Sequence, residues 1–372
     1  MLKRETAACY NVLRRSGSER ARSRFMGNAL RIPALVILSA AALAGCAGTP
    51  GQFWMPPEKE LIWPLPPDPP RVRYEGTITA ETIRDSASRG GFSAVLRLIA
   101  GAPEVKLQTP HGVSADGKTL AVADSGSAVV HLLDRTNGGY RAVESAGETR
   151  LQCPIGVAAD GEGGVFVGDA VLGRVFHLSR RGRLIDEVAG DFQRPTGLAY
   201  DAARRRLYVV DTPAHSVLTF QAGAGGYSLL RRLGGRGEEQ GAFSFPTHVC
   251  LAANGDLYVT DSLNFRVQVF TPDGASLRSF GRPGDGTGDF GTAKGVAADS
   301  EGHIYVVDSL FDVVQIFDEN GRFLLSFAGS GNKDGELWLP TGACVDGQDR
   351  IYVADSGNSR VQVYQYVRQQ KP

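Results

Sequence analysis

One pattern of apolar and polar residues repeats between residues 110 and 364. Each of the six repeats begins with a turn and a short apolar strand. A turn containing Gly and Asp follows, and then a second strand of aliphatic and aromatic residues that ends in Asp. The strand-ending residues are Asp124, Asp169, Asp211, Asp261, Asp308 and Asp355, at intervals of 45, 42, 50, 47 and 47 residues. A period in the forties that is built from short strands predicts a β-propeller with one four-stranded blade per repeat.

The sixth repeat ends without a fourth strand of its own. Residues 72–78 (VRYEGTI) precede the first repeat and have the alternation of a strand. We expect this N-terminal strand to complete the last blade, because such a closure pairs the ends of the ring and removes exposed sheet edges. The sequence therefore predicts an all-β fold, a six-bladed β-propeller over residues 71–372.

The N-terminal region has the pattern of an export signal. Residues 32–44 form an apolar run that is too short to cross a membrane and typical of a signal peptide. Residues 43–46 (LAGC) resemble the lipobox of bacterial lipoproteins, which implies cleavage before Cys46 and lipidation of its thiol. The alternative is an ordinary signal peptide that contains a Cys. Residues 1–25 are long and rich in arginine for a leader, which favours Met26 as the true start.

The resemblance to lipoproteins implies a location as well. A residue other than Asp after the lipidated Cys, here Ala47, favours the outer membrane of a Gram-negative bacterium. We thus expect residues 1–45 to be a signal peptide and the protein to be exported and anchored. Residues 46–70 contain eight prolines and predict an extended, semi-rigid tether that holds the propeller away from the membrane.

The charge balance argues against a nucleic-acid partner. Residues 1–45 hold eight of the 40 basic and two of the 40 acidic residues, which leaves 32 basic and 38 acidic residues in the remainder, a formal charge of −6. A nucleic-acid-binding protein needs a basic face.

Departures from the repeat gather on one face of the predicted ring. The loop that leads into the first strand of a blade and the loop between its second and third strands lie on the same face. His248 stands where the other repeats have Gly, and His111 and Lys294 replace a Thr of three repeats. The predicted binding residues at this tunnel mouth are His111, His215, His248, Lys294, Asp261, Asn264, Phe265, Asp308, Phe311 and Asp312.

Simpler roles compete with a binding site. The His and Lys side chains would then only satisfy polar groups around a water-filled tunnel. Each repeat Asp is expected to accept backbone N–H groups in its own turn. Arg174, Arg266 and Arg360 recur at one position and are expected to form ion pairs between blades. Metal binding by two or three of the histidines is a further alternative. Their spacing shows no convergence of ligands, so no metal and no cofactor is predicted.

Two segments carry a resemblance to a known family. Residues 353–364 (VADSGNSRVQVY) and 260–270 (TDSLNFRVQVF) resemble NHL repeats, and the likeness extends over about residues 72–366. The chain is most similar to exported bacterial six-bladed NHL lipoproteins, a group that implies the fold but no general activity.

The sequence favours a membrane-anchored, non-catalytic binding scaffold that presents one propeller face to a protein, peptide or glycan of the cell envelope. A propeller enzyme of the lactonase or lyase type is the first alternative. The chain resembles such enzymes only weakly. The lactonases have a Glu in a turn that leads into a first strand, and none of the six turns has one here. The amidating lyases have several histidines after the turn proline, and only His111 matches them. A purely architectural envelope lipoprotein is the second alternative.

Overall fold

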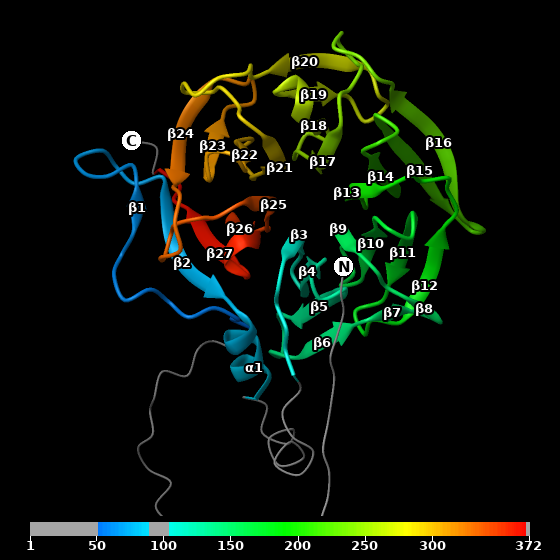
Figure 1. Ribbon diagram of the computed structural model, residues 1–372, viewed down its shortest axis with the longest axis horizontal. Coiled ribbons are helices and arrows are strands. Elements are labelled where there is room, and N and C mark those ends of the chain that lie inside the picture. Colours follow the sequence, from blue (N-terminus) through cyan, green and yellow to red (C-terminus); the bar gives the residue numbers. More distant parts are fainter. Residues whose placement is uncertain (1–50, 89–103, 370–372) are drawn as a thin grey trace, which may run out of the picture. The chain divides into compact units, whose positions relative to one another are not determined.

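A computed structural model describes residues 51–88 and 104–369 of the chain (Figure 1). The predicted signal peptide and Cys46 lie outside the described residues, so these expectations stay predictions. The repeats form six sheets arranged in a ring, with the first strand of each sheet nearest the axis (Figure 1). The predicted six-bladed propeller is confirmed.

The first three blades each contain one repeat. Blade 1 comprises β3 (Pro110–Ala115), β4 (Thr119–Asp124), β5 (Val129–Asp134) and β6 (Tyr140–Val143). Blade 2 comprises β9 (Pro154–Ala159), β10 (Val165–Asp169), β11 (Arg174–Leu178) and β12 (Leu184–Val188), and the short pair β7 (Ser145–Ala146) and β8 (Thr149–Arg150) precedes it. Blade 3 comprises β13 (Pro195–Asp201), β14 (Arg206–Asp211), β15 (Ser216–Gly223) and β16 (Gly226–Gly234).

The last three blades follow the same order. Blade 4 comprises β17 (Pro246–Leu251), β18 (Leu257–Asp261), the 3₁₀ turn η1 (Ser262–Asn264), β19 (Arg266–Phe270) and β20 (Ser276–Phe280). Blade 5 comprises β21 (Ala293–Ala298), β22 (Ile304–Asp308), β23 (Val313–Phe317) and β24 (Phe323–Ala328). Blade 6 comprises β25 (Pro340–Val345), β26 (Arg350–Asp355), the 3₁₀ turn η2 (Ser356–Asn358) and β27 (Arg360–Tyr366).

The outer strand of blade 6 comes from the N-terminal side of the first repeat. β2 (Val72–Ile78) pairs antiparallel with β27, and the register runs from Val72 opposite Tyr366 to Ile78 opposite Val361. β1 (Ile62–Trp63) adds a fifth strand outside β2. The side chains of β2 alternate between buried and partly exposed, because one face of a strand packs on the core and the other faces water.

The core lies between neighbouring blades. The second strand of each blade is apolar on both faces, and Tyr305, Val307, Ile351 and Val353 from blades 5 and 6 belong to one buried cluster. Each such strand is buried on both sides because adjacent blades cover its two faces, which explains the continuous apolar runs before the repeat Asp residues. Packing of blade against blade thus holds the ring together.

The proline-rich segment differs from the expected free spacer. Within residues 51–70, Phe53 is 1% exposed and Trp54 9% exposed, in a cluster with Ile78 and Tyr352. Trp63 packs on the ring of Tyr364 at a centroid distance of 5.9 Å. Apolar burial of this kind stabilises a docked segment, so the aromatic residues override the extended preference of the prolines.

The chain crosses from β2 to blade 1 through α1 (Ala80–Ser88), the one α-helix among the described residues. The hydroxyl of Thr79 accepts the backbone N–H of Thr82 at 3.2 Å, and the hydroxyl of Thr82 accepts that of Thr79 at 2.9 Å. These reciprocal bonds satisfy N–H groups that a helix start leaves free. Across residues 51–88 and 104–369, no helix has both the length and the apolar character needed to cross a membrane.

Candidate functional site

The repeat Asp residues organise the loops of one face, which we call the mouth face. All six are fully buried. Asp124 accepts the backbone N–H groups of Gln108 and Thr109, each at 2.8 Å. Asp308 similarly accepts those of Gly291 at 2.7 Å and Thr292 at 3.0 Å. The expected turn-bracing role of these carboxylates is confirmed, and it places Asp261 and Asp308 in the protein interior rather than against a ligand.

The side chain of Asn264 helps to hold the same loop together. Its amide donates to the carbonyl of Gly237 at 2.9 Å and to Asp261 at 2.8 Å, and Arg266 donates to the same carboxylate at 2.8 Å. Asn358 and Arg360 repeat this arrangement around Asp355 in blade 6.

The expected ion pairs between blades are therefore wrong. Arg266 and Arg360 pair with the Asp of their own blade, and Arg174 pairs with Glu187 on the neighbouring strand of blade 2. The reason is geometric, since the third strand begins only a few residues after the repeat Asp and antiparallel pairing brings Arg266 directly opposite Asp261.

Three predicted site residues share one strained backbone position. His215, Phe265 and Asp312 each lie four residues after a repeat Asp, and their φ angles are 50°, 53° and 55°. The side chains of His215 and Asp312 hold the loop that leads to the next blade. His215 accepts the N–H of Phe245 through Nδ1 at 3.2 Å, and Asp312 accepts that of Leu339 at 2.8 Å. Left-handed non-Gly residues persist where surrounding contacts hold them.

The first residue after the turn proline usually fastens one blade to the next. The hydroxyl of Thr196 donates to the carbonyl of Thr247 at 2.9 Å, and that of Thr341 donates to the carbonyl of His111 at 3.0 Å. The residue after it is Gly in five blades because the blades approach closely there. A Cβ at Gly342 would lie 2.5 Å from the carbonyl oxygen of His111.

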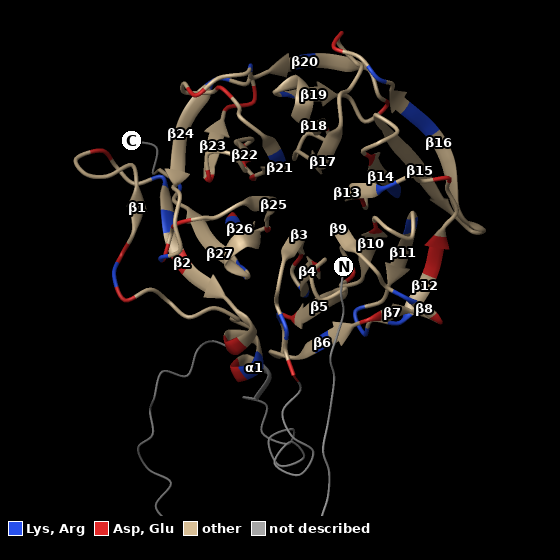
Figure 2. Ribbon diagram, viewed as in Figure 1, with Lys and Arg blue, Asp and Glu red and all other residues tan. Residues whose placement is uncertain are grey.

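His111, His248 and Lys294 depart from this fastening scheme and meet at the axis. They belong to β3, β17 and β21, in blades 1, 4 and 5. Lys294 is the single basic residue on the six described inner strands, and Figure 2 shows this blue segment of β21 beside the centre of the ring. The three side chains are half-buried. The structure thus brings together three of the ten predicted residues.

Burial keeps the two histidines neutral near pH 7. It lowers the pKa of His248 to about 3, with further contributions from His111 and Lys294. It lowers the pKa of His111 to about 4, together with the charge of Lys294 and against the opposing charge of Asp124. Burial also lowers the pKa of Lys294. A cation between neutral imidazoles is a suitable group to hold an anion.

Several side-chain nitrogens of His111, His248 and Lys294 have no hydrogen-bond partner within the described parts of the chain. Both ring nitrogens of His248 and Nδ1 of His111 are hidden from solvent without a hydrogen bond. Lys294 has no ion pair or side-chain hydrogen bond there either. Buried polar groups without partners are rare in native proteins, so each one calls for a reason. An arriving ligand that satisfies them would supply it.

Exposed apolar side chains surround this mouth on blades 4 to 6, and the sequence analysis found only one of them, Phe311. We call this set the apolar crescent. Each member lies in a loop that follows a repeat Asp or precedes a turn proline. The members are Phe245, Leu263, Leu310, Phe311, Trp338 and Leu339, with exposed fractions from 36% to 63%. Scattered exposed apolar residues are ordinary, but a set gathered on one face is typical of an interaction site.

Other openings of the structure lie away from the mouth. An axial cavity of about 230 Å³ is lined by Cys250, Cys344 and small apolar residues further along the inner strands. In residues 51–88 and 104–369, no three His, Cys, Asp or Glu side chains are placed to hold a metal ion together. The arrangement suits noncovalent binding of an anionic, partly apolar ligand.

The mouth loops of blades 4 and 6 are also where the chain matches a known family. The profile of the NHL repeat matches residues 243–270 and 337–364. These ranges span the last residues before the turn proline, the braced Asp and Asn, and the third strand. The chain is a β-propeller that contains NHL repeats.

Solved structures extend the similarity of this NHL propeller to about 71% of the chain. A structural genomics protein of unknown function from Bacteroides thetaiotaomicron has a TM-score of 0.56 at 18% identity, over 71% of each chain. An auxiliary nutrient binding protein from the same organism has a TM-score of 0.55 at 14% identity, over 71% of this chain and 70% of the other. A streptogramin B lyase has a TM-score of 0.52 at 11% identity, over 71% and 96%.

At these identities the neighbours show a common fold and nothing of a shared activity. No curated protein matches the sequence of this NHL propeller.

Proposed function

We propose that this NHL propeller is a non-catalytic binding module whose mouth face receives a protein or peptide partner in the cell envelope. The observation that carries the proposal is the unpartnered group of His111, His248 and Lys294 at the axis, surrounded by the apolar crescent. In this proposal the partner contributes an acidic group to Lys294 and apolar side chains to the crescent.

The chemistry of the apolar crescent and of Lys294 at the axis favours a protein or peptide partner over a glycan. Six exposed leucine, phenylalanine and tryptophan side chains offer apolar area for which a hydroxyl-rich glycan has little counterpart. Aromatic residues such as Trp338 often contribute most of the binding energy in interfaces. Lys294 adds charge selectivity, because a cation without an internal partner attracts an acidic group and disfavours a basic one.

The location is part of the same proposal. The apolar run at residues 32–44 and the lipobox-like sequence that ends in Cys46 support export and a lipid anchor. Replacing Cys46 with Ser is expected to release the exported protein from membranes. Unchanged membrane fractionation of this variant would contradict lipidation.

Solved neighbours agree with a binding role at the level of the fold. One is described as a nutrient binding protein, and a further propeller with a TM-score of 0.50 comes from a nidogen and laminin complex. Their identities of 14% and 16% do not transfer those ligands to this chain.

The test is affinity capture from envelope extract with the immobilised chain of residues 47–372. The mouth variants are Lys294→Met and the double variant Leu310→Ser/Trp338→Ser. The matched control is Ile185→Ser/Leu230→Ser, which removes exposed apolar side chains from the outer strands β12 and β16. We expect a discrete partner that the wild type and the control retain and both mouth variants lose. Retention by all four proteins, or by none, would contradict the proposal.

A further inference from the structure

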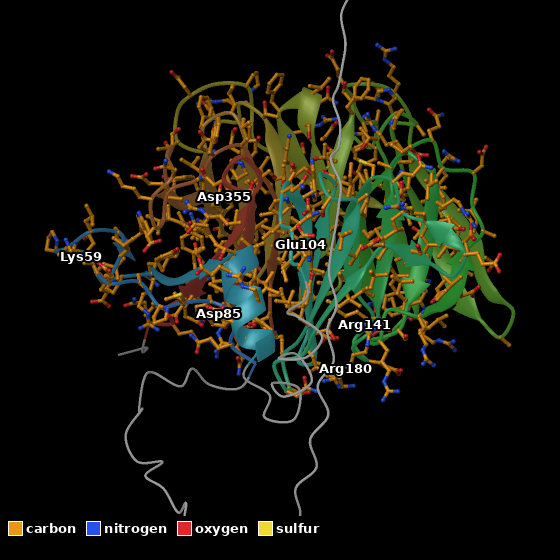
Figure 3. The ribbon with its side chains drawn as sticks, turned by 60° about the horizontal axis from the view of Figure 1, so that its bottom comes forward. Lys59, Asp85, Glu104, Arg141, Arg180 and Asp355 are labelled. Atoms are coloured by element: carbon orange, nitrogen blue, oxygen red, sulfur yellow. The ribbon has the colours of Figure 1, made fainter. Side chains whose placement is uncertain are left out.

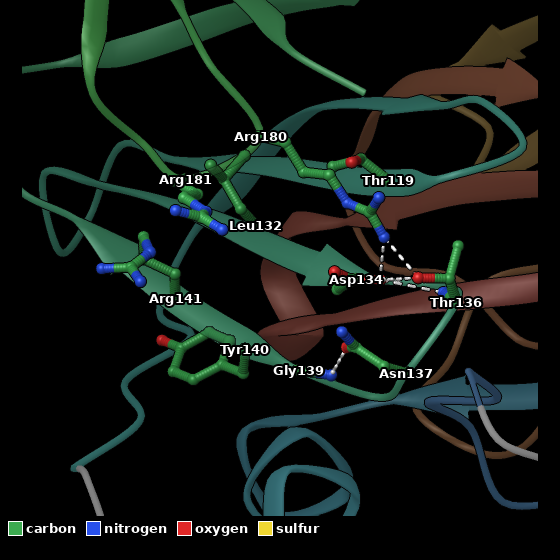
Figure 4. A pocket seen from close by; sticks show the side chains of 10 residues that line it. All are labelled: Thr119, Leu132, Asp134, Thr136, Asn137, Gly139, Tyr140, Arg141, Arg180 and Arg181. Carbon is green, nitrogen blue, oxygen red and sulfur yellow. Dashed lines mark hydrogen bonds and ion pairs between the residues drawn. The ribbon is translucent and has the colours of Figure 1, made fainter. Parts of the chain in front are cut away.

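A cleft rich in arginine lies on the face opposite the mouth, which we call the tether face. It opens between the β5–β6 turn of blade 1 and the β11–β12 turn of blade 2, with a volume of about 390 Å³ (Figure 4). Turns between third and fourth strands lie at the opposite end of a blade from the loops after the repeat Asp residues. Figure 3 agrees, since Arg141 and Arg180 lie low in that view and Asp355 lies above them.

Among the arginines in and beside the cleft, one is fixed in place and three are free to bind. Arg180 donates to Asp134 and Thr136 on the facing turn, which orients its guanidinium toward the cavity wall (Figure 4). Its Nε is hidden from solvent and has no hydrogen bond to any residue that the structure describes. Arg141, Arg181 and Arg183 are exposed and make no ion pair within the described residues.

The cleft has a positive charge even when nearby acids are counted. Asp134 is the acidic residue that lines it. An adjoining cavity of about 430 Å³ is lined by Arg141, Arg181 and Arg183, with Glu144 as its acidic residue. The four guanidinium groups therefore face two carboxylates. Arginine presents several N–H donors in one plane and is well suited to phosphate oxygens.

The start of the described chain lies beside this cleft. Gly51 packs against the backbone of Arg135 so closely that a Cβ on Gly51 would lie 1.8 Å from the carbonyl oxygen of Arg135. Arg135 belongs to the same turn as Thr136 and Asn137, which line the cleft. Gly51 is the fifth residue after Cys46, and a fully extended chain of that length spans at most about 17 Å. An acyl chain on Cys46 would keep this face close to the membrane.

We propose that the arginine cleft binds the phosphate headgroups of anionic lipids in the membrane that anchors Cys46. The inference rests on the proposed lipid anchor. Bound lipid would hold the tether face against the bilayer and direct the mouth face, with Lys294 and the apolar crescent, away from it. A lipid anchor fixes one point, and the cleft adds a second contact that sets the orientation of the ring.

Vesicle binding of the chain of residues 47–372 tests this cleft without the anchor. All helices and strands of the described structure begin at or after Ile62, so this chain contains the complete ring. The probes are phosphatidylcholine vesicles with and without phosphatidylglycerol, in a sedimentation assay at low salt. We expect binding to the anionic vesicles alone, although the formal charge of this part of the chain is −6.

The decisive variant is Arg141→Gln/Arg181→Gln, and Arg231→Gln/Arg236→Gln is a control of equal charge elsewhere on the ring. Each arginine near an anionic surface contributes roughly a fivefold gain in partitioning, so the cleft variant is expected to bind about 25-fold more weakly. The control should bind as the wild type does. Equal losses in both variants, or no preference for anionic vesicles, would overturn the proposal.

Two further arms separate the alternatives. Millimolar inorganic phosphate is expected to displace the protein no more than chloride of equal ionic strength does, because a bilayer presents many headgroups to the cleft at once. Displacement by phosphate but not by chloride would identify a site for soluble anions and overturn the lipid assignment. Lys294→Met is expected to bind vesicles as the wild type does, because Lys294 lies on the other face. Lipid binding by the cleft and partner binding by the mouth face are therefore tested independently, and either can fail without the other. Weakened vesicle binding of Lys294→Met would also overturn the proposal, because it would place the lipid contact on the mouth face.

Discussion

The loops of blade 6 and the axis of the propeller share the mouth face, but their polar side chains are held differently. Around Asp355, the groups of Asn358, Arg360 and Gln362 donate to one carboxylate and to nearby backbone carbonyls. At the axis, neither ring nitrogen of His248 has a hydrogen bond within the described residues. The braced carboxylate of the repeat stabilises the ring, whereas the ring nitrogens of His248, which departs from the repeat, are left without an internal hydrogen bond among the described residues. Mutations in the two regions should therefore affect different properties.

Asp355→Ala should have the largest effect, because it leaves Arg360 with a buried charge and no carboxylate partner. We expect a loss of about 3–5 kcal/mol in the free energy of unfolding, measured by urea denaturation at pH 7. The control is Asp273→Ala, which breaks an exposed pair with Arg206 and should leave the urea midpoint nearly unchanged. Equal losses would show that the loops of blade 6 are no more strongly braced than the surface.

Acidification should destabilise the ring through the axial histidines. Their pKa values in the folded state lie below the unfolded value of 6.5, so the unfolded state binds more protons as the pH falls below that value. The stability they contribute is complete above pH 6.5 and decreases toward pH 4. We expect a loss of roughly 2 kcal/mol for each histidine, or about 4 kcal/mol for the pair, between pH 7 and pH 5.

The double variant His111→Gln/His248→Gln checks this assignment. Its urea midpoint should vary less between pH 7 and pH 5 than that of the wild type. His303 works in the opposite direction, because its bond to Asp299 raises its pKa, and it is unchanged in both proteins. An identical pH dependence in the two proteins would refute the role of the axial pair.

Thr341→Val tests the fastening between blades 6 and 1. It removes the hydroxyl that donates to the carbonyl of His111 while keeping the side-chain volume. We expect a loss of about 0.5–1.5 kcal/mol in urea denaturation, typical of one hydrogen bond. A stability equal to the wild type would mean that packing alone joins these blades.

Lys294→Met should have the smallest effect on stability. We expect the free energy of unfolding to rise by no more than about 0.5 kcal/mol, because the substitution removes a half-buried cation that has no partner among the described residues. Urea denaturation at pH 7 measures this change. A loss above about 1 kcal/mol would show that Lys294 supports the fold, which would remove the contrast with Asp355.

The fold could be predicted because each blade repeats one local pattern. The Asp at the end of the second strand marks the same loop in all six blades, and that loop positions the next strand. The packing of residues 51–70 could not be predicted, because proline content favours an extended chain and the surface that covers Phe53 and Trp54 comes from distant parts of the sequence. The aromatic residues of this segment were the feature of the sequence that could have indicated its packing against the ring.

The candidate site could be predicted only in part. Comparison of repeats indicated His111, His248 and Lys294, because a change at a crowded inner strand needs a reason. The same comparison also selected His215 and Asp312, whose bonds to the next blade are visible only in three dimensions. Leu310 and Trp338 were missed because apolar residues in a loop are expected to be covered, and the sequence does not show which ones remain exposed.

Site-specific photocrosslinking on the anchored protein tests the central claim most directly. The crosslinker is placed at residue 310 in the apolar crescent, and a control is placed at residue 320, in an exposed turn of the tether face. The account predicts one discrete product from position 310 that disappears in the Lys294→Met background, and no such product from position 320. The same product from both positions, or a product at 310 that persists without Lys294, would contradict a binding site at the mouth.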